Sequence, residues 1–95
     1  MGLPWNIGYA ALMVHLLCNI KGIDLEPGEL LINTCDQHIY LNHIEAVKEQ
    51  ISRKPTEFPK LQINRKVDKI EDYNWNDISL LNYNPMSNIK APMAI

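Results

Sequence analysis

The most distinct pattern in the chain is an apolar segment near its N-terminus. Almost every position from Ile7 to Cys18 is apolar, so the segment lacks the polar face that a surface helix repeats every 3.6 residues. We predict a helix here, with a turn over Gly2–Asn6 before it, Asn6 as its N-terminal cap and Lys21-Gly22 at its end. A helix that is apolar all round is buried all round. The rest of the chain is too small to cover it, so we expect further chain or a partner subunit to do so.

Shorter patterns follow, and they alternate between helix and strand. Ile44, Val47 and Ile51 recur at helical spacing, whereas Leu61–Asn64 alternates between apolar and polar positions. The predicted elements are a loop at 24–28, strands at 29–35, 61–64 and 78–83, an extended piece or turn at 38–40, a helix at 43–54 that Asn42 caps and Pro55 ends, a short turn or helical piece at 70–75, and an extended tail at 84–95. Together they predict an α+β fold within one domain.

Composition and charge remove several classes of protein. Nine Lys and Arg against eleven Asp and Glu leave a net charge of −2, which gives no broad basic surface for nucleic acid. Hydrophobic residues make up 46%, too many for a disordered chain. The apolar segment is shorter than the roughly twenty residues of a membrane helix, and no basic residue precedes it as in a secretion signal. The two cysteines, Cys18 and Cys35, do not make a disulfide scaffold, so we expect a cytoplasmic protein without membrane partners.

The first polar cluster of interest is Asp36, His38 and His43. A carboxylate and two imidazoles could bind zinc or iron, but their spacing matches no strong metal signature, and two structural histidines explain the pattern as well. We therefore assign no metal. Cys18 lies in the apolar helix, where a thiolate is disfavoured, and Cys35 stands beside the negative charge of Asp36. Neither cysteine has the electropositive surroundings of a nucleophile, and residue types alone name no reaction.

Four strings of residues, taken in order, are more informative than composition. They are Gly2-Leu3-Pro4-Trp5-Asn6-Ile7, Asp36-Gln37-His38-Ile39-Tyr40-Leu41-Asn42-His43, Phe58-Pro59-Lys60-Leu61 and Ile89-Lys90-Ala91-Pro92-Met93-Ala94-Ile95. The first three resemble the thymidylate synthase patterns G-[LV]-P-F-N-I, D-x-H-[IL]-Y-x-N-H and P-K-L, and the fourth resembles the C-terminal tail of that family. The resemblance covers the whole chain. Residues 1–95 are thus similar to the C-terminal third of a thymidylate synthase domain.

The resemblance implies an α+β fold in which the apolar segment is a buried central helix packed on a mixed β-sheet. It also implies a homodimeric enzyme that converts deoxyuridine monophosphate (dUMP) to thymidine monophosphate (dTMP). Methylenetetrahydrofolate is the co-substrate that supplies both the carbon and the hydride. On the dUMP side, Asn6 is implied to hydrogen-bond the uracil amide edge, and His38 and Tyr40 to hold the 3′-hydroxyl. The residues implied for the folate side, where the tail closes over the ligands, are Gly2, Trp5, Met93, Ala94 and Ile95. Asp36 and Asn42 match the family string without an implied ligand role.

The same resemblance implies that the nucleophilic cysteine lies upstream, in a Pro-Cys-His string. No catalytic residue is therefore assigned here, and we expect this chain alone to be inactive. Neither Cys18 nor Cys35 aligns with the nucleophile; Cys35 stands where the family usually has Gly, and Met86-Ser87 where it usually has His-Pro.

Three hypotheses about function stay open. The first is the C-terminal part of a thymidylate synthase, as a gene fragment, a truncated chain or a subunit with a complementary N-terminal chain. The second is a non-catalytic remnant that binds a nucleotide or a synthase subunit. The third is part of a uridylate hydroxymethylase, since Asn6 argues only against the cytidylate enzyme, where the family has an acidic residue.

Overall fold

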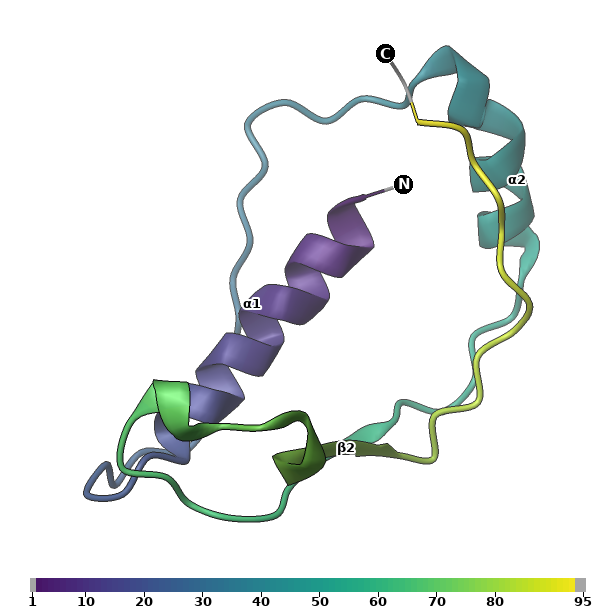
Figure 1. Cartoon of the computed structure of the whole chain (residues 1–95). Coiled ribbons are helices and arrows are strands. Elements are labelled where there is room, and N and C mark those ends of the chain that lie inside the picture. Colours follow the sequence, from purple (N-terminus) through teal and green to yellow (C-terminus); the bar gives the residue numbers. More distant parts are fainter. Residues whose placement is uncertain (1, 94–95) are drawn as a thin grey trace.

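The computed structural model describes residues 2–93, and its elements are short and widely spaced. In chain order they are α1 (Leu3–Cys18), the 3-10 turn η1 (Leu41–His43), α2 (Ile44–Ser52), β1 (Lys60–Ile63), the 3-10 turns η2 (Ile70–Asp72) and η3 (Trp75–Asp77), and β2 (Ile78–Leu81). The chain forms an open ring, with α1 inside it, α2 on one side and the two strands at the base (Figure 1). Helices combined with a sheet confirm the predicted α+β class, and the sheet formed by the described residues is an antiparallel pair, not a mixed sheet.

Helix α1 begins earlier than the sequence pattern predicted. The cap position is Gly2, no side chain caps the helix, and Pro4 lies in the first turn. Proline suits that place because its fixed φ is helical and its missing N–H would have no partner there. The predicted turn over residues 2–6 and the cap at Asn6 are therefore wrong, since Asn6 lies inside the helix. The helix ends at Cys18, and Gly22 follows in the left-handed region with φ 80°.

The apolar faces of α1 remain largely uncovered in this chain. Only Leu16 of the helix is buried, whereas Trp5 is 80% exposed. The radius of gyration is 16.5 Å, against about 12 Å for a compact domain of this length. The accessible surface is 8473 Å², against about 5,600 Å² for a compact protein of this mass. Covering of α1 by further chain or a partner subunit stays a prediction, and this excess of surface is the physical reason for it.

The two strands form one antiparallel hairpin-like pair at the base of the ring. The register pairs Lys60 with Leu81 and Ile63 with Ile78. Along β1 exposed and half-buried residues alternate, as predicted. The strands predicted at 61–64 and 78–83 are thus confirmed with slightly different bounds. The strand predicted at 29–35 is wrong: that segment runs without a sheet partner among the described residues, and a strand without a neighbour leaves its hydrogen-bonding groups unpaired.

Helix α2 confirms the predicted second helix but not its cap. Its apolar positions are those expected, and it ends at Ser52, because the chain is already extended at Arg53, two residues before Pro55. Asn42 does not cap it. The residue belongs to η1, and the cap position is taken by His43, which makes no side-chain capping bond. The 3-10 turn satisfies the start of the helix through its own backbone, with the His43 N–H donating to the Tyr40 carbonyl at 2.8 Å.

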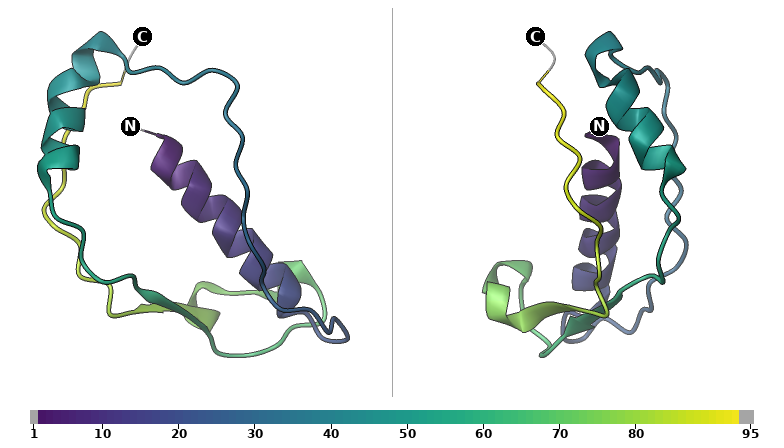
Figure 2. Two further views of the ribbon diagram at one scale, coloured as in Figure 1. Left: turned by 180° about the vertical axis from the view of Figure 1, so that it is seen from behind. Right: turned by 90° about the vertical axis from the view of Figure 1, so that its right-hand side faces the viewer.

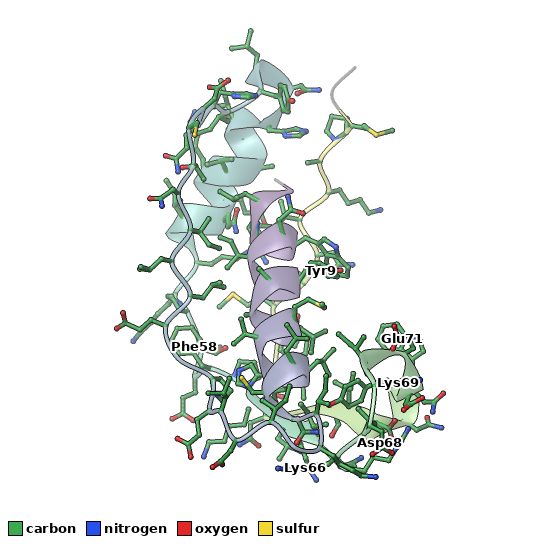
Figure 3. The ribbon with its side chains drawn as sticks, turned by 90° about the vertical axis from the view of Figure 1, so that its left-hand side faces the viewer. Tyr9, Phe58, Lys66, Asp68, Lys69 and Glu71 are labelled. Carbon is green, nitrogen blue, oxygen red and sulfur yellow. The ribbon has the colours of Figure 1, made fainter. Side chains whose placement is uncertain are left out.

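A set of backbone contacts attaches the C-terminal end of α1 to the loop at residues 64–77, and we call this junction the tether. Ile20 and Val67 form a parallel bridge, in which the Lys21 N–H donates to the Val67 carbonyl at 2.8 Å. Val67 is 1% exposed, the most buried side chain of the described residues. Figure 3 shows this loop, with Lys66, Asp68 and Lys69 labelled, beside the lower end of α1.

Side chains reinforce the tether on both sides of the bridge. Asn19 donates from Nδ2 to the Arg65 carbonyl at 2.8 Å, and the Tyr73 hydroxyl donates to the Leu16 carbonyl at 3.1 Å. Arg65 Nε donates to Asp77 Oδ1 at 2.8 Å. The Arg65 guanidinium, helped by a backbone N–H, holds the pKa of the Asp77 carboxyl below its ordinary value. The loop is therefore fixed by polar contacts.

The last described residues form the extended tail that the sequence predicted. Residues 84–93 carry no helix or strand and return along α2 toward its N-terminal end (Figures 1 and 2). Among residues 2–93, none of the helices has both the length and the apolar character needed to cross a membrane.

Candidate functional site

The residues assigned to ligands lie on three segments that reach the same end of the molecule. They are the first turn of α1, the segment 36–43, and the end of the tail. Figure 2 shows from two sides that the start of α2 and the end of the tail lie at the end opposite the sheet, and that α1 starts inside the ring in the same half of the molecule. Positions 30 to 90 residues apart in the chain are thus presented together, although Ala94 and Ile95 lie outside the described residues.

His38 and Tyr40 lie on one side of an extended segment, as their spacing predicted. Their rings meet edge to face, with centroids 5.1 Å apart and planes at 82°. Both side chains are accessible, since the His38 side chain is 55% and Tyr40 50% exposed. A phenol and an imidazole held in this way can approach one ligand hydroxyl from the same side.

Asp36 sets which nitrogen of His38 carries the proton, a role that was not predicted from the sequence. Its Oδ1 lies 3.3 Å from His38 Nδ1. A carboxylate only accepts, so this contact places the proton of a neutral imidazole on Nδ1 and leaves Nε2 as the acceptor. His38 can then accept the proton of a ligand hydroxyl, while the Tyr40 hydroxyl can donate to the same oxygen. The Asp-x-His spacing was the signal that could have indicated this.

His43 is the one buried member of the segment. It is 7% exposed, its Nε2 lies 2.5 Å from the Pro92 carbonyl oxygen, and its ring meets that of Tyr40 edge to face with centroids 5.6 Å apart. From the sequence, His43 is expected only as a metal ligand or a structural residue. Its contact with the tail was missed, because the sequence does not show which helix the tail follows.

The first turn of α1 contributes exposed side chains. Gly2 and Asn6 are exposed, Trp5 is 80% exposed, and Met93 at the tail end is 85% exposed. Among residues 2–93 no hydrogen bond joins this turn to the segment 36–43. The assigned residues are therefore brought to one end of the molecule, and the contacts between segments run from 36–43 to the tail.

The alternatives for metal and thiol chemistry gain no support from the geometry. His43 Nε2 already contacts the Pro92 carbonyl, and in the part of the chain that the structure describes no three His, Cys, Asp or Glu residues gather as a metal site would require. Both cysteines are free thiols; Cys18 is half-buried at the end of α1 and Cys35 is exposed. Neither lies within the segment 36–43 or the tail.

These observations define an α+β protein with a structural base and an open end that carries hydrogen-bonding and aromatic groups. A sequence profile of the thymidylate synthase family matches residues 1–95, the whole chain. The chain belongs to the thymidylate synthase family.

Individual relatives agree with this assignment. Over all 95 residues the chain is 45% identical to the thymidylate synthase of Homo sapiens, 43% to that of Herpesvirus ateles and 40% to that of Saccharomyces cerevisiae. It spans 30%, 32% and 31% of those proteins respectively, about a third of their length.

Proposed function

We propose that this chain is the C-terminal part of a thymidylate synthase and supplies one wall of its dUMP and folate sites. The observation that carries the proposal is the pairing of His38 and Tyr40 on one accessible face, with Asp36 behind the imidazole. A remnant that only contacts a synthase subunit would need no such oriented pair, and one that binds the nucleotide is distinguished by the test below. The complete enzyme is a cytoplasmic homodimer in this proposal, as in the hypothesis from the resemblance.

On the nucleotide side, two groups bind the sugar and one reads the base. The 3′-hydroxyl of dUMP donates to His38 Nε2 and accepts from Tyr40, which matches the directions that Asp36 imposes. Asn6 presents one acceptor and one donor to the N3–H and O4 of uracil. Its side chain is available for this role because it does not cap α1.

On the folate side, apolar surface is the main contribution. Trp5 and Met93 are the most exposed of the apolar side chains on this side, and a planar ring system can stack on or against them. Gly2 lets the chain approach the ligand closely, and Ala94 and Ile95 continue the tail on the folate side. Closure of a tail over bound ligands excludes water from the reacting atoms.

The chemistry itself requires a group that this segment does not provide. A cysteine thiolate adds to C6 of uracil and makes C5 nucleophilic, and C5 then takes its one-carbon unit from methylenetetrahydrofolate. C5 loses its proton, the thiolate leaves C6, and a hydride from the same folate reduces the one-carbon unit to methyl. The residues of this chain bind and orient the two substrates and hold the sugar in place during these steps.

The test is tritium release from dUMP labelled at C5, measured on the full-length protein with methylenetetrahydrofolate. We expect release with matching formation of dihydrofolate, because the folate that donates the hydride is oxidised. Residues 1–95 alone should give no release. A full-length protein that binds dUMP without release would support the non-catalytic remnant, and release without dihydrofolate would support the hydroxymethylase. Release by residues 1–95 that Cys35→Ser abolishes would contradict the assignment of the nucleophile upstream.

A further inference from the structure

Two side chains at opposite ends of α2 hold the tail. His43, at the N-terminal cap position, contacts the Pro92 carbonyl through Nε2 at 2.5 Å. Arg53, at the C-terminal cap position, donates from its guanidinium to the Ser87 carbonyl at 2.6 Å and, at 3.4 Å, to the Ser87 hydroxyl. The main acceptor is a backbone carbonyl in both cases. The contacts therefore fix the path of the tail and depend little on its side chains.

His43 can act as a donor in only one arrangement. A carbonyl oxygen only accepts, so the proton must be on Nε2. In the neutral ring Nδ1 is then a bare acceptor, and it is a buried atom without a partner among residues 2–93. A buried unpaired acceptor is uncommon in proteins. Within residues 2–93, the contact from Nε2 to the Pro92 carbonyl is therefore the hydrogen bond that this ring makes.

Arg53 is oriented by its own helix. Glu49, one turn earlier, accepts from the same guanidinium at 2.5 Å, and the Arg53 side chain is only 22% exposed. A guanidinium held by a carboxylate on one side presents its remaining donors in a fixed direction. It can therefore engage Ser87 without first being ordered.

We propose that His43 is a positioning residue which, together with Arg53, latches the tail onto α2 and so sets where Met93 stands for the folate. This inference rests on the proposed function. The contact between the His43 and Tyr40 rings, with centroids 5.6 Å apart, joins the latch to the residues that hold the sugar. Nucleotide and folate sides are thus connected through a single buried imidazole.

Two substitutions in the full-length protein separate the two properties of His43. His43→Gln keeps an N–H donor near the position of Nε2 and removes the ring. His43→Phe keeps the ring against Tyr40, removes the donor, and also removes the unpaired Nδ1, so it should not unfold the protein. The latch proposal predicts that Phe disrupts tail attachment and Gln preserves it.

Tail attachment is measured by trypsin cleavage after Lys90, an exposed residue that lies between the two attachment points. We expect His43→Phe to speed this cleavage about three- to tenfold, the equivalent of one hydrogen bond, and His43→Gln to change it less than twofold. Cleavage after Lys69, in the loop of the tether, is the internal control and should stay unchanged (Figure 3). Equal cleavage after Lys90 in His43→Phe and the parent protein, or equal acceleration by Gln and Phe, would overturn the latch.

Kinetics then test whether the latch matters for catalysis. His43→Phe should raise KM for methylenetetrahydrofolate and lower kcat, each about three- to tenfold, and should change KM for dUMP less than twofold. In His43→Gln, KM for methylenetetrahydrofolate and kcat should stay close to those of the parent protein. If kcat and both KM values worsened by the same factor, His43 would be a merely structural residue and the positioning role would be overturned. Because the cleavage assay needs no turnover, an inactive parent protein would refute the proposed function while the latch is still judged by proteolysis.

Discussion

The two ends of the molecule are built in different ways. At the base, α1 is tethered to residues 64–77 by a backbone bridge and by side-chain hydrogen bonds, and Val67 and Asp77 are buried there. At the opposite end, the residues assigned to ligands that lie within 2–93 are exposed, and His43 is the one buried residue in the neighbouring segment 36–43. At the base the polar groups named above hydrogen-bond to one another, whereas at the open end the assigned polar groups face solvent.

This difference indicates where structure and function are separated along the chain. The hydrogen bonds at the base join the end of α1 to the loop 64–77, so changes there should act on folding. Groups at the open end have donors and acceptors left over, so changes there should act on ligands. The latch on α2 combines a structural contact with a role toward the ligand, because the buried His43 side chain sets the position of the exposed Met93.

The largest expected effect concerns Asn6 at the open end, and it tests whether this residue recognises the uracil ring or only belongs to the helix. Asn6→Asp in the full-length protein should lower kcat/KM for dUMP about ten- to a hundredfold. Binding of deoxycytidine monophosphate should be kept or improved. Uracil offers N3–H beside O4, and a carboxylate cannot donate to O4. A mismatch of buried polar groups costs about 1–3 kcal/mol. Turnover of dUMP and competitive binding of deoxycytidine monophosphate give the ratio.

The same substitution carries its own control for stability. Asn6 does not cap α1, and an acidic residue in the first turn interacts favourably with the helix dipole. The thermal midpoint of Asn6→Asp should therefore match that of the parent protein. If the uridylate-to-cytidylate ratio stayed as it was, Asn6 would not read the base, and the proposed nucleotide site would lose its main support.

The sequence predicted the features that depend on local spacing and missed those that depend on contacts between distant segments. Local patterns gave α2, the alternating strand at 61–64 and the extended tail, because spacing alone encodes them. The cap at Asn6 failed because Pro4 starts the helix first. The strand at 29–35 failed because strand formation needs a neighbour, which local sequence does not reveal. The latch could not be predicted, since residues 43 and 92 meet only through the path of the tail.

An intermediate effect is expected at the base. Tyr73→Phe removes a hydroxyl that donates to the Leu16 carbonyl at 3.1 Å and accepts from Asn19 Nδ2 at 3.0 Å. Loss of these partly buried bonds should lower the free energy of unfolding of the full-length protein by about 1–2 kcal/mol, measured by urea denaturation. KM for dUMP should stay unchanged.

A matched substitution makes this test specific. Tyr83 is 57% exposed, so Tyr83→Phe removes a hydroxyl of the same kind from a more accessible position near the end of β2. We expect its effect on the free energy of unfolding to be below about 0.5 kcal/mol. Equal destabilisation by the two variants, or a change in KM for dUMP in Tyr73→Phe, would contradict the separation between base and open end.

The smallest expected effect concerns Asp36, the residue behind His38. The carboxylate lies 3.3 Å from Nδ1, and both side chains are accessible, at 86% and 55%, so the pair is weak. Its proposed role is to select the tautomer whose Nε2 accepts from the 3′-hydroxyl. Asp36→Ala removes the acceptor and should raise KM for dUMP about two- to fivefold, whereas Asp36→Asn keeps an acceptor oxygen and should restore most of the loss. The nucleotide without the 3′-hydroxyl, 2′,3′-dideoxyuridine monophosphate, distinguishes orientation from general electrostatics. Because it offers no hydroxyl to His38, the Ala variant and the parent protein should bind it equally. If Asp36→Ala weakened both nucleotides by the same factor, the carboxylate would act through its charge alone, and the geometry of Asp36, His38 and Tyr40 would not determine how the sugar is held.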